Sequence, residues 1–404
     1  MKIKNILVLS FLVLTVCLFI LAFVRIKGQI LLVDEGNHFD QIMRFVRGEF
    51  QFNPILMTIP GYHFFIGIVA KLLKLASISQ VRTISLLVNL FAIPLFYVLS
   101  KKMDRTYSFL QTMQFIFFPL IFPFYFLIYT DIFSLILILL SFIFVLKKNY
   151  TLSGLFCAAS LFVRQNNLIW LFFFNTVLYI QSISFTVEKT SLIKHARKSV
   201  FFIGAILLLF VFFMINGGIV VSGYAKNFVH ISLSLLGNVY FSLFVSFILF
   251  LPRQIESFKR IIRLLTTNKY IFLFLFIFYF LYINTFVNDN PFNHATWFLH
   301  NAALEYFVRD FITKSFFFLL ISYAMMTLVV SPLRVKWGYL LYPFSFVYLL
   351  PYWLIEPRYY FIPLTLFLLL VKKMDQKYEH LQLFWFLLLS LYIFEGIVSL
   401  KFFL

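Results

Sequence analysis

Residues 6–26 read ILVLSFLVLTVCLFILAFVRI, and this run decides the class of protein to which the chain belongs. Crossing a bilayer as a helix takes about 20 predominantly apolar residues, and the run has that length. Lys2 and Lys4 precede it, as basic residues precede the apolar part of a signal peptide, but no small-residue cleavage site follows. We therefore expect an uncleaved first transmembrane helix.

The composition extends this interpretation to the whole chain. Of its 404 residues, 62% are hydrophobic and 12% are charged, and the mean hydropathy is +0.96. A soluble domain has about a quarter of its residues charged, so lipid must be the solvent for much of this chain. The 60 Phe against 13 Gly and 12 Pro give bulky, continuous runs rather than the alternating strands of a membrane barrel. The sequence predicts an all-α polytopic membrane protein.

Further apolar runs bring the expected number of transmembrane helices to about 13. They occupy 83–100, 109–127, 131–147, 151–163, 167–181, 199–221, 231–251, 270–287, 311–331, 338–354, 359–371 and 381–401. Segment 60–76 is short for a span, opens with Pro-Gly and carries Lys71 and Lys74. We expect it to lie in the interface as a juxtamembrane helix, within a first outer loop of about residues 27–82.

The distribution of charge supports this topology. With 60–76 in the interface, one set of alternate loops holds 21 of the 34 Lys and Arg residues and five of the 15 acids. The other set holds 13 (34 − 21) basic residues, ten (15 − 5) acids and five of the seven histidines. Cytoplasmic loops carry the excess of Lys and Arg, so the net charge of +19 needs no nucleic-acid partner. If 60–76 crossed the membrane, this bias would largely reverse.

Several kinds of site are not expected. Cys17 and Cys157 lie in apolar runs, which argues against a disulfide framework or a thiolate metal site. A Gly-rich loop for nucleotide phosphates is missing from the sequence. We predict no cofactor and no metal, although Asp34, Glu35 and Asp131 have the chemistry to hold a divalent ion.

Polar segments gather on the acidic side of this topology. The segment 34–38, DEGNH, directly follows the first helix and suits a general base acting on a sugar hydroxyl. An acidic helix cap is the simpler alternative. The segment 129–131, YTD, forms a whole outer turn, and its acid is either a turn residue or a functional group at a depth where charge is costly.

Four more segments complete the set. The segment 164–167, RQNN, interrupts an apolar stretch, and its arginine suits a lipid-linked phosphate, with snorkelling to headgroups as the alternative. The loops 216–230 and 288–309 combine flexible backbone with scattered charges and histidines, which is also typical of ordinary connections. In 356–360, EPRYY, the acid and the arginine could simply pair with each other. Together the segments suit an enzyme that draws a lipid-linked substrate from the bilayer.

In order and in wording, six segments resemble the dolichyl-phosphate-glucose-dependent α-1,2-glucosyltransferases, which add the last glucose to the lipid-linked oligosaccharide of N-glycosylation. The similar segments are 34–38, 58–62, 129–131, 163–170, 216–230 and 356–360. The chain departs from the family pattern at Ile59, which replaces a proline, and at Asn166, which replaces a threonine. It also departs where the family has a Gly-Asp-Lys stretch, because Gly223 is followed here by Tyr224. The resemblance covers residues 34–363, and the loop 288–310 departs most.

The resemblance implies a GT-C-like bundle forming a single transmembrane glycosyltransferase domain over residues 1–404. It implies a multi-pass protein of the endoplasmic reticulum membrane with a lumen-facing site, or of the plasma membrane in a prokaryotic source. The partners would be a dolichyl phosphate glucose donor, a lipid-linked oligosaccharide acceptor and membrane lipids. Displacement would invert the anomeric centre, so that one base suffices.

The resemblance also assigns residues. Asp34 is the expected base, with Glu35 as the second choice. Arg164, Arg358, Lys226 and His230 are expected to bind the donor phosphate, and Asp131 and His38 to orient sugar hydroxyls or the base. The remaining substrate-binding positions are Gln165, Asp289, His294 and Glu356.

Two alternatives stay open. The first is another transferase of the same architecture that uses a polyprenyl-phosphate sugar, such as a mannosyl- or aminoarabinosyl-transferase. The second is a transporter or flippase for a lipid-linked sugar. A transporter should have polar residues along both halves of its path, whereas here one half has only apolar spans and basic loops.

Overall fold

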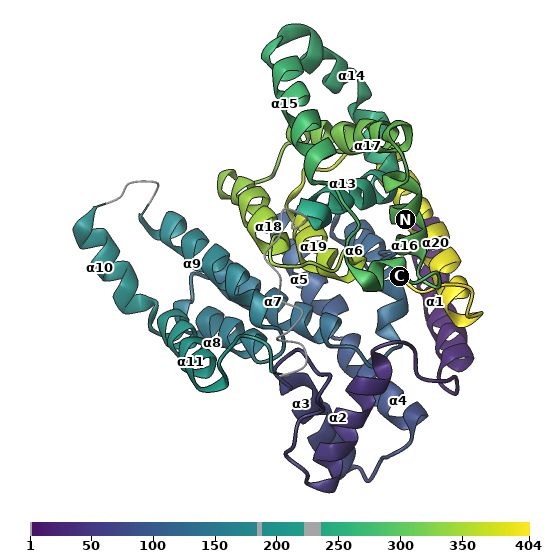
Figure 1. Ribbon diagram of the computed structural model, residues 1–404, viewed down its shortest axis with the longest axis vertical. Helices are drawn as coiled ribbons and strands as arrows, with labels where there is room; N and C mark the ends of the chain where they lie inside the picture. Colours follow the sequence, from purple (N-terminus) through teal and green to yellow (C-terminus); the bar gives the residue numbers. More distant parts are fainter. Residues whose placement is uncertain (1, 184–187, 222–235) are drawn as a thin grey trace.

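The computed structural model describes residues 2–183, 188–221 and 236–404, and within them the chain is helical (Figure 1). The only extended pairing among these residues is two isolated bridges, Phe298 with Phe403 and Leu333 with Val371. An all-α fold is therefore confirmed.

The first half of the chain contains eleven of these elements. They are α1 (Lys2–Ile26), α2 (Glu35–Arg47), α3 (Gly61–Leu72), α4 (Ile78–Asn89), α5 (Ala92–Met103), α6 (Ser108–Ile116), η1 (Phe122–Tyr125), α7 (Thr130–Leu146), α8 (Tyr150–Leu161), η2 (Gln165–Asn167) and α9 (Leu168–Ile183).

The second half begins after the gap at 184–187 and contains a second gap at 222–235, between α11 and α13. Its elements are α10 (Lys189–Lys198), α11 (Val200–Asn216), α13 (Gly237–Leu249), α14 (Leu251–Thr267), α15 (Tyr270–Thr285), η4 (Pro291–His294), α16 (Leu299–Val308), α17 (Phe311–Val330), η5 (Lys336–Leu340), α18 (Leu341–Leu349), η6 (Pro357–Tyr360), α19 (Phe361–Leu370) and α20 (Gln376–Val398).

Four helical stretches of the described chain are long and apolar enough to cross a membrane: Leu9–Ile26, Ile78–Met103, Phe311–Val330 and Gln376–Val398. The bent pairs α10–α11 and α13–α14 raise the number to six if each is one span. The chain is thus a polytopic membrane protein, but the expected count of about 13 spans is not confirmed. Several expected spans are helices of 10–17 residues, which rise about 15–26 Å and fall short of a 30 Å hydrocarbon core.

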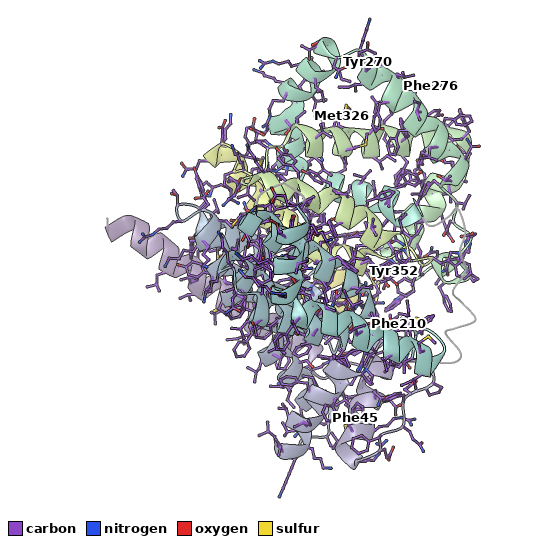
Figure 2. The ribbon with its side chains drawn as sticks, turned by 90° about the vertical axis from the view of Figure 1, so that its left-hand side faces the viewer. Phe45, Phe210, Tyr270, Phe276, Met326 and Tyr352 are labelled. Carbon is purple, nitrogen blue, oxygen red and sulfur yellow. The ribbon has the colours of Figure 1, made fainter. Side chains whose placement is uncertain are left out.

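The outside of several helices is apolar. Phe210 on α11 and Tyr270 and Phe276 on α15 are 57%, 70% and 67% exposed, and Figure 2 shows Tyr270 and Phe276 near the top of the molecule. Large aromatic side chains facing outward in such numbers fit a lipid solvent.

The expected run 109–127 is not one helix. Helix α6 ends at Ile116, and the chain then continues through turns and η1 up to Tyr129, buried throughout. Pro119 and Pro123 explain the break, because proline lacks the backbone donor that a helix needs and clashes with the preceding turn. This irregular segment lies in the centre of the main core.

The segment 61–72 is a short helix, α3, as the sequence predicts for 60–76. It packs between α2 and α4 in a compact unit at the bottom of Figure 1. Gly67 permits the close approach of α2, since a Cβ there would lie 2.9 Å from the Cβ of Phe45. Ile42, Tyr62 and Ile66 form a small core of their own. This unit carries the first polar segment.

Helices α1 and α20 define two ends of the molecule. At one end Arg25 pairs with Glu395 at 2.8 Å and Gln29 Nε2 donates to Val398 O at 3.0 Å. At the other end Glu379, in the first turn of α20, bonds to Gln114. Because α20 has 23 residues, it rises about 34 Å in all, enough to cross a bilayer, and the 16 residues (395 − 379) from Glu379 to Glu395 span about 24 Å of it. We call these the Asp34 end and the Glu379 end.

Candidate functional site

The Asp34 end contains a carboxylate paired with a buried arginine. Arg358 Nη2 donates to Asp34 Oδ2 at 2.8 Å, and Arg358 Nε donates to Glu356 Oε1. The guanidinium carbon lies 4.9 Å from the centre of the Tyr129 ring, a cation–π contact. The Arg358 side chain is 7% exposed, whereas that of Asp34 is 45% exposed. Asp34 is therefore accessible from outside the protein while its partner is fixed.

Asn238 holds the loop that carries Glu356 and Arg358. Its Oδ1 accepts from Glu356 N at 3.2 Å and from Tyr360 Oη at 3.0 Å, and its Nδ2 donates to Tyr352 O and Leu354 O. Sequence reasoning missed Asn238, although a lone amide inside the apolar run 231–251 was a visible signal.

Glu35, next to Asp34, occupies a different environment. It is fully buried and bidentate with Arg82, whose Nε and Nη2 donate to its two oxygens at 2.9 and 2.5 Å. It also accepts from Leu32 N and Ile128 N, both at 3.0 Å. Its oxygens are thus filled by the protein, which leaves Asp34 as the acid of this pair that is open to a substrate.

Arg82 joins three parts of the chain that are far apart in sequence. Its Nη1 donates to Ile26 O at 2.6 Å and Gln29 O at 2.9 Å, which caps the end of α1. Through Glu35 it fixes the start of α2, and through Ile128 N the turn before α7. Sequence reasoning did not single out Arg82.

The backbone before Asp34 is strained. Val33 has φ +50°, a conformation that a β-branched residue rarely adopts. Bonds on both sides impose it: Glu35 N and Tyr129 Oη each donate to Leu32 O at 2.9 Å. The Glu35–Arg82 pair therefore sets the direction in which Asp34 leaves the chain.

A second ion pair lies at the start of α7. Arg164 Nη2 is 2.8 Å from Asp131 Oδ1, and both side chains are buried, at 12% and 1% exposed. The chain breaks at Arg164 between α8 and η2, as the sequence predicts. Gln165 Nε2 donates to Met57 O and Ile219 O, at 3.3 and 3.0 Å, and so ties the break to two loops.

His38 lies close enough to both ion pairs to be affected by the charges of their arginines. Its Nδ1 lies 2.8 Å from His63 Nε2, and its ring packs edge-on against Tyr129, with centres 5.2 Å apart. Burial and the positive charges of Arg358 and Arg164 lower the pKa of His38 to about 3. His38 is neutral at physiological pH, and it can accept or donate a hydrogen bond without carrying charge.

His300 on α16 is a further group that the assignment by resemblance missed. It is 6% exposed, and burial together with the charge of Arg358 lowers its pKa to about 3. Burial also raises the pKa of Glu356, against the opposing effect of Arg358. Asp34 and Asp131 act on the same Glu356 carboxyl, so the acids of both ion pairs belong to one electrostatic unit.

Other expected residues lie apart from this unit. Asp289 accepts from Trp353 Nε1 at 2.9 Å on the surface, and His294 faces Glu305 at 3.7 Å with both side chains about half exposed. Lys226 and His230 fall outside the described residues. No group of three His, Cys, Asp or Glu side chains in the described ranges is placed to hold a metal ion.

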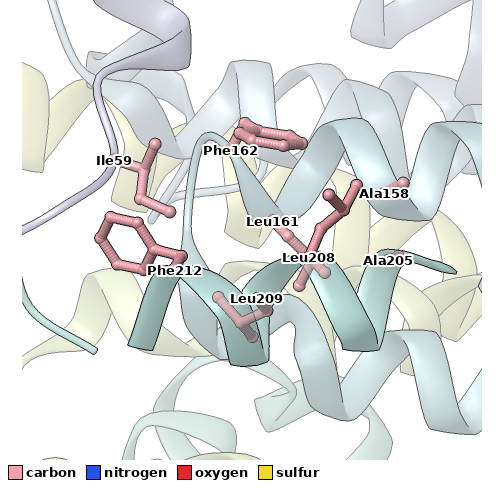
Figure 3. A pocket seen from close by; sticks show the side chains of 8 residues that line it. All are labelled: Ile59, Ala158, Leu161, Phe162, Ala205, Leu208, Leu209 and Phe212. Atoms are coloured by element: carbon pink, nitrogen blue, oxygen red, sulfur yellow. The ribbon is translucent and has the colours of Figure 1, made fainter. Parts of the chain in front are cut away.

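An apolar groove between α8 and α11 includes Phe162, two residues before Arg164 in the sequence. A cavity of about 570 Å³ is lined by residues including Ala158, Phe162, Gly204 and Leu208. A smaller hollow shares Ala158, Phe162 and Leu208 and reaches Ile59 (Figure 3). Both hollows are almost entirely apolar, so they offer a surface that suits an alkyl chain.

Comparison with known proteins gives matches along the chain. Residues 28–199 match the DIE2/ALG10 family. A Candida albicans protein named Dol-P-Glc:Glc(2)Man(9)GlcNAc(2)-PP-Dol alpha-1,2-glucosyltransferase is 26% identical over 307 residues, 69% of this chain and 66% of that protein. A Debaryomyces hansenii protein of the same name is 24% identical over 417 residues, 89% of this chain and 88% of that protein.

Another protein of that name, from Yarrowia lipolytica, is 29% identical over 153 residues, 34% of this chain and 29% of that protein. The match therefore spans slightly less than two thirds of the Candida albicans protein and less than a third of the Yarrowia lipolytica protein. No solved structure matches this chain. The resemblance to the α-1,2-glucosyltransferases is confirmed, and the family match contains four of the six segments, 34–38, 58–62, 129–131 and 163–170.

Proposed function

We propose that this chain, whose residues 28–199 match the DIE2/ALG10 family, is an inverting glucosyltransferase of the lipid-linked oligosaccharide. The donor is dolichyl phosphate glucose and the acceptor Glc(2)Man(9)GlcNAc(2)-PP-dolichol, the substrates in the names of its relatives. The observation that carries the proposal is the half-exposed Asp34 carboxylate, held by buried Arg358.

The proposed reaction needs one base. The Asp34 carboxylate takes the proton of the acceptor 2-hydroxyl while that oxygen attacks C1 of the donor glucose. The bond from C1 to the phosphate oxygen breaks, and its electron pair leaves with dolichyl phosphate. Attack opposite the leaving group turns a β-linked donor into an α-linked product. The phosphate leaves without a general acid because arginine stabilises its charge.

Arg164 is the proposed partner of the donor phosphate. Its guanidinium is buried beside Asp131, and the α8–α11 groove reaches Phe162, two residues earlier in the sequence, so we place the polyprenyl chain of the donor in this groove. An arginine fork matches two phosphate oxygens. Arg358 is the second proposed cation, since its Nη2 already bonds to the base. His38 and Asp131 orient sugar hydroxyls. Gln165 stabilises the helix break between α8 and η2, and Glu356 holds Arg358 in position.

Glu35 has a positioning role in this proposal. Its four hydrogen bonds leave no oxygen for a substrate, and they direct Asp34 outward. The multi-pass protein resides in the endoplasmic reticulum membrane, with the Asp34 end in the lumen. This orientation agrees with the basic residues near the Glu379 end, because cytoplasmic loops carry the positive excess.

A transfer assay with purified protein tests the proposal. Dolichyl phosphate glucose and a lipid-linked oligosaccharide that lacks its terminal glucose are expected to give a product heavier by one hexose, with the new linkage α-1,2. Polyprenyl-phosphate mannose and aminoarabinose serve as competing donors. A product from one of these, and none from the glucose donor, would identify another transferase. Movement of lipid-linked sugar across vesicles without any transfer would identify a flippase.

A further inference from the structure

The Glu379 end holds a second buried ionic cluster, which the proposed reaction does not use. Glu379 is 1% exposed and accepts from Met374 N and Gln114 Nε2, both at 2.8 Å. Lys373 Nζ lies 3.4 Å and Arg253 Nη2 3.7 Å from its oxygens. One carboxylate thus faces two cations in a buried place.

Arg334 adds a third cation and is not fully bonded. Its Nε donates to Val371 O at 3.0 Å, and its backbone N donates to Leu370 O. The side chain is 8% exposed, and Nη2 faces Asp104 Oδ2 at 3.4 Å. Neither Nη1 nor Nη2 makes a hydrogen bond with any part of the described chain. A buried guanidinium with open donors is unfavourable unless something else accepts from it.

The charges of this cluster do not cancel. Arg253, Arg334 and Lys373 face Glu379 and Asp104, which leaves one positive charge (3 − 2). Burial, and repulsion from Arg334 and Arg253 against the attraction of Glu379, lower the pKa of Lys373 to about 8. The cluster opens to the surface at Asp104, which is 27% exposed. The surface nearby is basic, with exposed Lys102, Arg105, Lys336 and Lys372.

The cluster lies opposite the candidate active site. Helix α19 begins directly after Tyr360 and ends two residues before Lys372, so it leads from one end to the other. Helix α20 also joins the two ends, and its residues Glu379 and Glu395 are separated by a rise of about 24 Å. A ligand bound here therefore approaches from the other face of the membrane.

We propose that Arg334, Arg253 and Lys373 form a binding site for a phosphate group at the membrane face opposite Asp34. The two open nitrogens of Arg334 suit two phosphate oxygens, and the phosphate balances the surplus charge. Such a group is supplied by the headgroup of an anionic phospholipid in the adjacent leaflet or by free phosphate. The inference is independent of the proposed glucosyl transfer.

The test uses the full chain in nanodiscs of phosphatidylcholine with added phosphatidic acid, and in detergent with inorganic phosphate. Arg334→Gln removes the open donors but leaves the partners of Glu379 in place. Wild type is expected to retain phosphatidic acid about tenfold better than this variant, since a hydrogen bond to a charged group contributes about 1.5–3 kcal/mol. Arg260→Gln is the matched control, because Arg260 loses the same charge from a surface pair with Glu256.

The nanodisc and detergent experiments distinguish the two sources of the phosphate group. Retention of phosphatidic acid identifies a lipid site, and binding of inorganic phosphate alone identifies a site for a free anion. Equal binding by wild type, Arg334→Gln and Arg260→Gln overturns the site, and so does binding by none of them. If Arg334→Gln fails to fold, Lys373→Gln replaces it. Retention by wild type should also weaken from pH 7 to pH 9, as Lys373 loses its charge.

Discussion

The two ends of α19 hold clusters of ionic groups, and the net charges of the two clusters have opposite signs. The Asp34 end has four acids and three arginines, a surplus of one negative charge (4 − 3), and the Glu379 end has three cations and two acids. The groups of the first end are Asp34, Glu35, Asp131, Glu356, Arg82, Arg164 and Arg358. Buried charges need partners, so the sign of the surplus charge at each end indicates which kind of ligand that end can bind.

At the first end the carboxylates outnumber the arginines, and Asp34 is the exposed carboxylate. At the second end the cations outnumber the acids, and the guanidinium of Arg334 has two nitrogens without a hydrogen bond in the described chain. Asp34 is half exposed and its second oxygen is open to a hydroxyl donor. Arg334 is buried, and its open nitrogens need an acceptor. The first arrangement suits proton removal and the second suits anion binding. Substitutions that exchange these properties are the direct way to test the comparison.

The largest expected effect follows Asp34→Asn. The amide has the shape of the carboxylate but cannot take a proton, so the transfer rate should fall by about 10²- to 10⁴-fold. The unfolding temperature should hardly change, because Asp34 is 45% exposed. Initial rates of glucose transfer by purified variants give the measurement. Asp40→Asn, which alters an exposed pair with Arg44 on the same helix, is the control, and an active Asp34→Asn enzyme would remove Asp34 from this role.

Glu35→Gln should act on stability instead. It leaves Arg82 buried without a counter-charge, which costs about 3–5 kcal/mol. Thermal unfolding in detergent measures the loss, and Glu49→Gln, in a surface pair with Arg47, should leave the unfolding temperature unchanged. If Glu35→Gln instead kept the stability of wild type and lost only turnover, the distinction between the two adjacent acids would fail.

The sequence predicted several residues of the candidate site but not the residues that hold them in place. Asp34, Asp131, Arg164 and Arg358 were predicted because charge is rare in apolar runs, and in the structure the four lie close enough for their charges to act on one another. Arg82 was not found, because its partner Glu35 is 47 positions away and a basic residue in a predicted outer loop has an ordinary explanation. Long-range pairing of this kind leaves no local pattern.

The fold shows the same division. The length of the apolar runs identified the class of protein, and the polar segment that interrupts one of them identified the break at Arg164. It failed in 109–127, where an apolar run has the composition of a span but contains two prolines and lies buried in the protein. Hydropathy does not distinguish burial in lipid from burial in protein. The expected count of about 13 spans is therefore not confirmed by the four to six helices of the described residues that have the length and composition of a span.

Arg164→Lys should lower kcat/KM for the donor by about 10- to 100-fold. The ammonium keeps the charge beside Asp131 but loses the planar fork, and hydrogen bonds to a charged group contribute about 1.5–3 kcal/mol. Initial rates at varied donor concentration give the measurement. Arg47→Lys, which alters an exposed pair with Glu49, is the control. An unchanged kcat/KM for Arg164→Lys would place the donor phosphate elsewhere.

His38 at the Asp34 end and Lys373 at the Glu379 end should make the stability of the protein depend on pH in two different ranges. Folded His38 takes up its proton near pH 3 and the unfolded chain near 6.5, so stability is lost as pH falls from 6.5 towards 3, by about 2 kcal/mol at pH 5. His38→Asn should flatten this dependence in thermal unfolding. Lys373 acts at the other end, since its folded pKa of about 8 lies below the usual 10.5 and stability rises with pH between these values. A slope unchanged by His38→Asn would contradict the assignment.

The smallest effect concerns the apolar groove. Gly204 lines the cavity, and no atom lies within 4 Å of the position that its Cβ would take, so Gly204→Leu fills the groove without displacing the protein. A polyprenyl chain would then lose contacts worth about 0.8 kcal/mol per methylene, or about fourfold in kcat/KM. A donor with a short isoprenoid should be unaffected, because its chain ends before the groove. Gly28→Leu, at a second glycine with open space around it, should affect neither donor. Equal losses with long and short donors would mean that Gly204→Leu disturbs the Asp34 end itself, and the polyprenyl chain would have to leave the site by another face.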